Sequence, residues 1–274
     1  MKGRFKAIGI QTALAFAAVL VLLPIVVLIL SSLKTDVELS RGALGLPESL
    51  QWKNYKMVWI EARFKTYLAN SLIIGICTTL LVLILSALAG FGFSKFNFLG
   101  QNVLFLFILM GLMLPPTVII IPLYYRLRDL GLLDTLPGIF LPLVGLGIPF
   151  GTFLMRQFFK DVPNELLDAA IIDGCNRFTA FLFVFLPIAK GGLQSLAVVQ
   201  FMFAWREYFL PLIISQSDKT QTLTVGLYRL YKSYVASYAR IAAGTILVFL
   251  PILVVYIILQ RRFATGMIAG SLKG

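Results

Sequence analysis

The sequence predicts an all-α integral membrane protein with six transmembrane helices and a short cytoplasmic helical element between the fourth and fifth spans. Of its 274 residues, 59% are hydrophobic and only 13% are charged, whereas about a quarter of the residues in a typical soluble domain are charged. Apolar runs of about 20 residues, the length needed to cross a bilayer, recur along the chain. The segment 161–187 interrupts them with several charged residues and must therefore lie in water or against another protein.

Six segments are long and apolar enough to be spans, and with their loops they form one predicted transmembrane domain over residues 1–274. They are residues 10–33, 68–94, 102–125, 136–158, 186–214 and 240–260. The first apolar run follows a basic N-terminus and resembles a signal peptide, but it is longer than the 7–15 residues of a signal core. We therefore expect it to remain as the first span.

The orientation of the chain follows from the basic residues near the termini. Six crossings place both termini on one side, together with 161–187. Lysine and arginine divide almost evenly between the two sides, so we weigh most heavily the residues held close to the membrane by short termini, which are Lys2, Arg4, Lys6, Arg261 and Arg262. Such residues favour the cytoplasmic side, and we expect both termini there.

The composition excludes several functions. The net charge of +12 is spread over the ends of apolar runs, which favours anionic lipid and not nucleic acid. The chain has no histidine, which removes Ser-His-Asp and Cys-His catalysis and the commonest metal ligand. Cys77 and Cys175 lie in different environments and are expected to be free thiols. The phosphate-binding loop of nucleotide hydrolases is absent as well.

The charged segment 161–187 is expected to form two short helices joined by a glycine turn. Pro163 or Asn164 can start the first helix, and Glu165 and Asp168 favour its positive end. Gly174 can adopt the left-handed conformation that ends a helix. Each helix carries a short apolar face at helical spacing, formed by Leu167, Ala170, Ile171 and Gly174 in the first helix and by Phe178, Phe181, Leu182 and Phe185 in the second.

An ordered set of motifs then indicates a family. Asp168-Ala169-Ala170, Asp173-Gly174 and Leu186-Pro187 resemble the Glu-Ala-Ala motif of the permease subunits of bacterial ATP-binding-cassette importers. Further motifs along nearly the whole chain are similar to the carbohydrate-uptake branch of that family: Asn70-Ser71, Leu114-Pro115, Gly131 to Thr135, Trp205-x-Glu207, and the ending from Gln260-Arg261 to Lys273-Gly274.

This resemblance implies a non-catalytic permease in the bacterial inner membrane. It implies a second homologous permease, two ATPase subunits that bind ATP and magnesium, an extracytoplasmic solute-binding protein and a sugar substrate, with no cofactor in this chain. The 161–187 loop would dock on the ATPase through Glu165, Asp168, Ala169, Ala170, Asp173 and Gly174. Two residues depart from the family pattern, because Asp168 replaces a glutamate and Arg206 replaces an asparagine.

Candidate residues for the solute path lie late in the fifth span. Arg206 and Glu207 are adjacent charges in an apolar segment, where ionisable groups indicate function, and Gln200, Trp205 and Tyr208 offer hydrogen bonds and stacking. The alternative is that the two charges reach headgroups or water and the aromatic residues pack against lipid or protein.

A second function class remains open, which is a secondary transporter driven by an ion gradient. It would require acidic groups near mid-membrane and an internal repeat, and neither is clear in the sequence. An intramembrane enzyme is disfavoured by the lack of histidine and of paired carboxylates within the spans.

Overall fold

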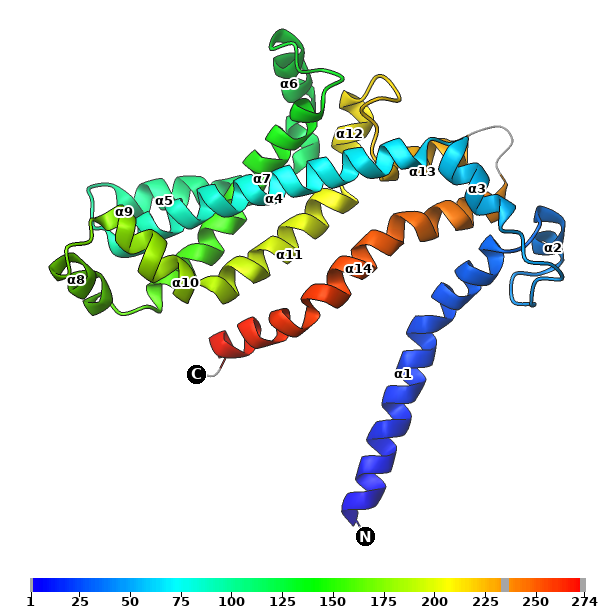
Figure 1. Cartoon of the computed structure of the whole chain (residues 1–274), viewed down its shortest axis with the longest axis horizontal. Coiled ribbons are helices and arrows are strands. Elements are labelled where there is room, and N and C mark those ends of the chain that lie inside the picture. Colours follow the sequence, from blue (N-terminus) through cyan, green and yellow to red (C-terminus); the bar gives the residue numbers. More distant parts are fainter. Residues whose placement is uncertain (1, 233–236, 272–274) are drawn as a thin grey trace. The chain divides into compact units, whose positions relative to one another are not determined.

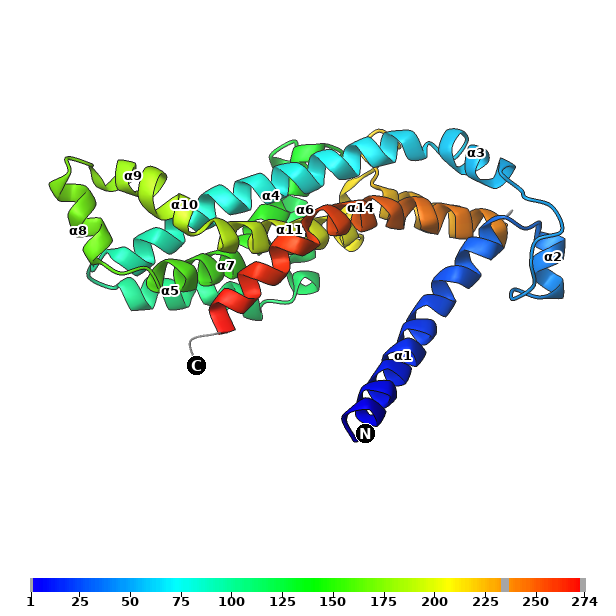
Figure 2. The same ribbon diagram turned by 60° about the horizontal axis from the view of Figure 1, so that its bottom comes forward.

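The computed structural model describes residues 2–232 and 237–271, with side chains described for 9–232, 237–255 and 257, and every regular element in these ranges is a helix (Figures 1 and 2). The basic side chains that were used to orient the chain, Lys2, Arg4, Lys6, Arg261 and Arg262, lie outside the described side chains, as does Lys273-Gly274.

Four helices within the described part of the chain are long and apolar enough to cross a membrane. They are α1 (Lys2–Ser32), α4 (Phe64–Lys95), α7 (Leu136–Lys160) and α14 (Tyr238–Ser271). Two further bent helix pairs raise the number of crossings to six if each pair counts as one span. The predicted all-helical membrane fold is confirmed.

The predicted third span, 102–125, is not one straight helix. It is divided into α5 (Gln101–Met110), the 3₁₀ turn η1 (Gly111–Met113) and α6 (Pro116–Asp129), and the two halves are bent by 98°. Leu114 is extended, as expected before a proline. Because Pro115 and Pro116 both lack an amide hydrogen, the helical hydrogen-bond ladder cannot pass through them.

The predicted fifth span, 186–214, is divided as well. The chain leaves α10 (Leu186–Ile188) and enters α11 (Lys190–Arg206) through a bend of 77° at Ala189. Helix α11 then ends at Glu207, which is extended, and a separate short helix, α12 (Phe209–Ile214), follows. Hydropathy alone does not report these two breaks in backbone geometry.

The chain forms two compact units. One holds Met1–Lys65 and Gly226–Pro251, with α1, α2 (Asp36–Arg41), α3 (Lys53–Ile60), most of α13 (Leu223–Lys232) and the start of α14. In this unit Thr35 and Glu38 form a capping box at the start of α2, and the buried Lys34 ammonium donates to the carbonyls of Gly42 and Ala43 at 3.0 and 3.1 Å.

The other unit holds Thr66–Val225 and Ile252–Gly274 and contains every predicted site residue. Within it, α7 packs along α11 (Figure 1). Glycines make the close approaches possible, as is common between membrane helices. A Cβ atom at Gly151 would lie 2.2 Å from Ser86 Oγ of α4, and one at Gly90 of α4 would lie 2.7 Å from the backbone of α7. Small residues therefore set the spacing of α4 and α7.

Candidate functional site: the 161–187 segment and a cavity beside α11

The first half of the charged segment forms the predicted short helix and glycine turn. Helix α8 (Glu165–Ile172) follows Asn164, and Glu165 and Asp168 lie in its first turn. Gly174 has φ +88°, the left-handed region that favours glycine. The Gly174 and Cys175 amides donate to the carbonyls of Ile171 at 3.0 Å and Ala170 at 2.9 Å, so two free carbonyls at the helix end are satisfied.

The second half differs from a plain α-helix. Helix α9 (Arg177–Ala180) begins at Asn176, whose Oδ1 accepts from the Thr179 amide at 2.8 Å. The chain then continues as a π-helical turn, η2 (Phe181–Phe185), into α10. Turns of this kind are rare and frequently occur at functional sites. The sequence pattern does not distinguish it from an α-helical turn.

The predicted apolar faces are buried only in part. Leu167, Ala170, Phe181 and Phe185 are buried in one cluster with Phe91 and Phe159. Ile171, Gly174, Phe178 and Leu182 belong to the same faces but are exposed. Because α8 has only about two turns, only a narrow side of it reaches the cluster. In the following segment Ala180, Phe181 and Phe185 belong to the cluster and Val184 and Leu186 pack against it, whereas Phe183 is exposed.

The outer face of α8 combines apolar and acidic side chains. Ile172 is 85% exposed, and Leu166 is exposed as well. Glu165, Asp168, Ala169 and Asp173 share this exposed surface, whereas Ala170, which was expected to permit close approach of a partner, is 6% exposed and packs into the chain's own core. We call the exposed set the α8 outer face: Glu165, Leu166, Asp168, Ala169, Ile172 and Asp173.

A cavity of about 440 Å³ lies beside α11, and it brings three of the five solute-path candidates together. Its lining includes Gly147 and Phe150 of α7 and Gln200, Phe203, Arg206 and Glu207 of α11 and its end. The volume is in the range of small-molecule sites. Gln200 is only 4% exposed, and it fits because residue 147 is glycine: a Cβ atom there would lie 2.6 Å from Gln200 Nε2.

The two charges at the cavity point to different partners, as expected for helix neighbours. The Arg206 guanidinium lies 4.5 Å from the centroid of the Phe203 ring, a cation–π contact. One Glu207 carboxylate oxygen accepts from the amides of Phe209 at 2.9 Å and Leu210 at 3.0 Å. Glu207 thus caps α12 as well as lining the cavity.

The two aromatic candidates have different surroundings. Trp205 is buried and stacks on Phe201 with 5.6 Å between ring centroids, which supports the packing alternative. Tyr208 is half-buried and directly precedes α12.

The loop after α12 is held by Asp134, which comes from another part of the same unit. Asp134, which has φ +55° in the turn before α7, accepts through Oδ1 from the amides of Gln216 at 3.0 Å and Ser217 at 2.9 Å and from the Thr220 hydroxyl. Partial burial alone would raise the pKa of Asp134, but these hydrogen bonds outweigh it and lower the pKa from 3.8 to about 2. Asp134 belongs to the Gly131–Thr135 motif, but the motif alone predicts no role for its carboxylate.

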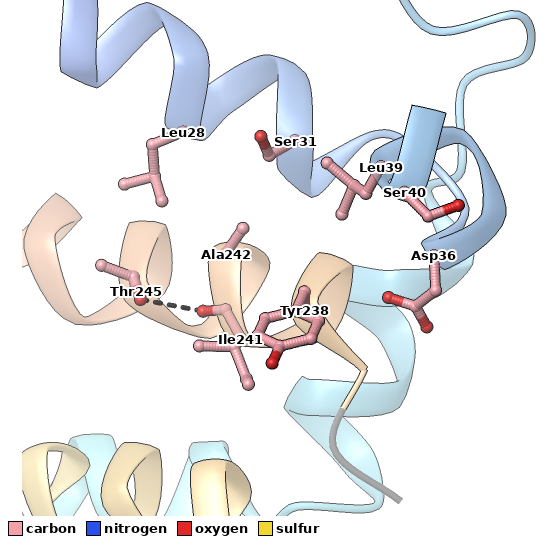
Figure 3. Close-up of a pocket in the computed structure, with 9 residues that line it drawn as sticks. All are labelled: Leu28, Ser31, Asp36, Leu39, Ser40, Tyr238, Ile241, Ala242 and Thr245. Atoms are coloured by element: carbon pink, nitrogen blue, oxygen red, sulfur yellow. Dashed lines mark hydrogen bonds between the residues drawn. The ribbon is translucent and has the colours of Figure 1, made fainter. Parts of the chain in front are cut away.

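The other compact unit contains a cavity of its own, of about 490 Å³, between the end of α1, α2 and the start of α14 (Figure 3). Leu28 and Ile241 make part of it apolar, while Asp36, Ser40 and Tyr238 lie toward its other end. Asp36 also accepts from the Ala239 amide at 3.1 Å, which satisfies a free donor at the start of α14.

Comparison with known proteins identifies the family. The model of the binding-protein-dependent transport system inner membrane component matches residues 82–268, more than half of the chain. The chain belongs to this family. It is a multi-pass inner membrane permease of a binding-protein-dependent transporter, and ATP hydrolysis resides on a separate subunit.

Several curated relatives match this permease over most of their length. It is 31% identical to the diacetylchitobiose uptake system permease protein NgcG of Streptomyces coelicolor, over 98% of this chain and 90% of the relative. It is 32% identical to the arabinooligosaccharides transport system permease protein AraQ of Bacillus subtilis, over 94% and 92%. It is also 32% identical to the lactose transport system permease protein LacG of Rhizobium radiobacter, over 100% and 98%.

A solved structure has the same fold. It is a bacterial ABC transporter involved in the import of the acidic polysaccharide alginate, and a chain of it matches with a TM-score of 0.82 and 22% identity, covering 96% of this permease and 98% of that chain. At this identity the likeness concerns the fold.

Proposed function

We propose that this permease forms half of the translocation pathway of an ATP-driven importer of sugars or oligosaccharides. The observation that carries the proposal is the near full-length similarity to relatives named for diacetylchitobiose, arabinooligosaccharides and lactose. The cavity beside α11 is compatible with a sugar, because its lining includes an amide, a guanidinium and two phenyl rings among aliphatic side chains. Hydroxyl groups can bond to the first two, and the apolar face of a sugar ring can pack on the rings.

The 161–187 segment is the proposed contact with the ATPase subunits. The α8 outer face exposes apolar and acidic side chains, a combination that suits docking into a cleft of another protein. We assign Glu165, Asp168, Ala169 and Asp173 to this contact, Gly174 to the turn that ends α8, and Ala170 to the packing of α8 on its own subunit. A short helix held by buried residues can pass a rigid-body displacement to the spans.

Topology and exposure support the proposed orientation of the permease and its proposed contacts with a second permease and a solute-binding protein. With six crossings, α8 and both termini share the cytoplasmic side. The most apolar 18-residue stretch of α1 is 0% buried within this chain, which suits contact with a second, homologous permease or with lipid. An extracytoplasmic solute-binding protein would deliver the sugar at the opposite end.

The decisive experiment uses the complete transporter. The permease is reconstituted in proteoliposomes with its second permease and ATPase, and uptake and ATP hydrolysis are measured with the loaded binding protein and a panel of neutral and acidic oligosaccharides. We expect ATP-dependent uptake of at least one sugar. Uptake by this chain alone, driven by an ion gradient, would reject the proposal in favour of a secondary transporter.

A glycine pair in α7 tests the solute path. Gly147→Ala places a methyl group against Gln200 and Val82, so we expect it to displace the Gln200 amide and lower uptake about tenfold, the effect of losing about one hydrogen bond. Gly145→Ala is the matched control, since a Cβ atom at Gly145 meets nothing within 4 Å. Equal uptake by the two variants would argue against a path past Gln200.

A further inference from the structure

Lys95, the last residue of α4, makes contacts that reach beyond its own helix. A cation at a helix C-terminus is favourable by itself, because it faces the negative end of the helix dipole. Here, however, the ammonium donates to the carbonyl of Val162 and to Oδ1 of Asn164, the latter at 2.9 Å. It also lies 5.4 Å from the centroid of the Phe185 ring. These three residues flank the α8–α9 pair on both sides.

The contact with Asn164 replaces a local helix cap. An asparagine before a helix usually accepts a backbone amide of the first turn through its side chain, but Asn164 makes no such bond to α8. Its oxygen accepts from Lys95 instead. The start of α8 is therefore fixed to α4 and not only to its own first turn.

The neighbouring contacts connect the same elements. Phe91 of α4 lies 5.0 Å from Phe185 and 5.1 Å from Phe181 between ring centroids, and the Arg177 guanidinium of α9 lies 4.9 Å from the Phe96 ring just after α4. The apolar contacts are compatible with sliding, since packing alone is not directional. The charge-assisted hydrogen bonds of Lys95 are directional and stronger than neutral ones.

We propose that Lys95 is a positioning residue that passes displacement of α8 to α4. The proposal rests on the proposed function, in which the ATPase moves α8. Helix α4 then carries the displacement to its other end, where Asn70 and Ser71 bind the loop at 219–223. The 25 steps from Asn70 to Lys95 cover about 37 Å at 1.5 Å per residue, so the two hydrogen bonds of Lys95 at one end of α4 are linked to residues on the far side of the membrane.

The test uses three variants in the complete reconstituted transporter. Lys95→Met keeps the length of the side chain and removes the charge, Lys95→Arg keeps the charge and the donors, and Lys160→Met is the control. Lys160 is an exposed lysine that also ends a span, α7. Sugar uptake and ATP hydrolysis are measured in the same vesicles, so that the number of sugars moved per ATP is obtained.

We expect Lys95→Met, which removes both hydrogen bonds of the ammonium, to lower the number of sugars per ATP at least about tenfold, the factor for losing one hydrogen bond to a charged group, while basal ATP hydrolysis is retained. Lys95→Arg should restore most of the ratio, and Lys160→Met should match the wild type. A purely structural role predicts that uptake and hydrolysis fall together. That result, or an unchanged ratio in Lys95→Met, would overturn the proposal.

A second measurement tests the role of Lys95 even if the transporter imports none of the tested sugars. Stimulation of ATP hydrolysis by the binding protein needs a signal to cross the membrane, whether or not a tested sugar is taken up. Lys95→Met should abolish this stimulation and Lys95→Arg should retain it. Stimulation that persists in Lys95→Met rejects the role of Lys95, whereas a wild-type complex that is stimulated but imports none of the sugars rejects only the proposed substrate class.

Discussion

Two irregular segments bind opposite ends of α4, and they satisfy their polar groups in different ways. The 161–187 segment contacts Lys95 at the C-terminal end. The 215–223 loop contacts the N-terminal end, where Asn70 Nδ2 donates to the carbonyls of Lys219 at 2.8 Å and Gln221 at 2.9 Å. Both are fixed to the same helix, but only one keeps a large surface free.

Most of the polar groups of the 215–223 loop are bonded within the chain, although the buried Gln221 Oε1 has no hydrogen-bond partner in the described part of the chain. Asp134 accepts three hydrogen bonds from it, the Ser71 hydroxyl accepts from the Leu223 amide at 2.9 Å, and Ser215, Thr220, Gln221 and Thr222 are buried. On α8, by contrast, Ile172, Asp168 and Asp173 are exposed. The difference indicates a rigid loop at one end of α4 and a docking helix at the other.

The largest expected effect is on the α8 outer face. Ile172→Asp places a charge where an ATPase subunit would bury an apolar side chain, and a buried unpaired charge is costly. We expect uptake by the complete transporter to fall more than tenfold, together with weaker co-purification of the ATPase. The thermal midpoint of the permease should not change, because Ile172 is 85% exposed in this chain.

Leu99→Asp is the control for that variant. Leu99 is an exposed aliphatic residue in the turn after α4, on the side of the membrane predicted for α8. It should leave ATPase association close to the wild-type level. If Leu99→Asp and Ile172→Asp weaken association equally, the cytoplasmic surface as a whole is involved and the α8 outer face has no special role.

The sequence predicted those features of the 161–187 segment that arise from local chemistry. Glycine at 174 and the acidic first turn of α8 were sufficient to predict a helix, a turn and a second helix, because left-handed backbone and helix-dipole preferences act within a few residues. The placement of Gln200, Arg206 and Glu207 at one cavity also agrees with the predicted solute path, which stays a proposal.

What could not be predicted depends on contacts between residues distant in sequence. Lys95 and Asn164 are 69 positions apart, and Asp134 and Thr220 are 86 apart, so no local pattern connects them. The burial of Ala170, the exposure of Ile171 and Phe178, and the bend at Ala189 depend on which side of each short helix meets the core. The spacing of apolar residues indicates that each short helix has a buried side, but not how many residues that side includes.

The next effect concerns the rigid loop. Asp134→Asn removes the negative charge that accepts three hydrogen bonds, so we expect the permease to lose about 2 kcal/mol of stability at pH 7, a typical value for hydrogen bonds to a charged group. The thermal midpoint of the purified complex measures the loss.

The pH dependence of the same residue gives a further check. Because the pKa of Asp134 is lowered from 3.8 to about 2 in the folded protein, its contribution is fully present above about pH 4 and is lost as the pH falls toward 2. The wild type should therefore lose more stability between pH 4 and pH 2 than Asp134→Asn does. Parallel pH profiles for the two proteins would contradict the assignment.

The smallest effect is expected at Ser71, which supplies a single neutral acceptor. Ser71→Ala leaves the buried Leu223 amide without this bond, and we expect a loss of about 1 kcal/mol of stability.

Combining Ser71→Ala with Asp134→Asn tests whether 215–223 is one rigid unit. Independent sites give additive losses, whereas residues that hold one element couple by about 0.5 kcal/mol or more. If the loop is one rigid unit, the first substitution already loosens it. The second substitution then lowers the stability by less than it does in the otherwise wild-type protein. Strict additivity would mean that Asp134 and Ser71 hold separate parts of the loop, and the contrast with α8 would then rest on burial alone.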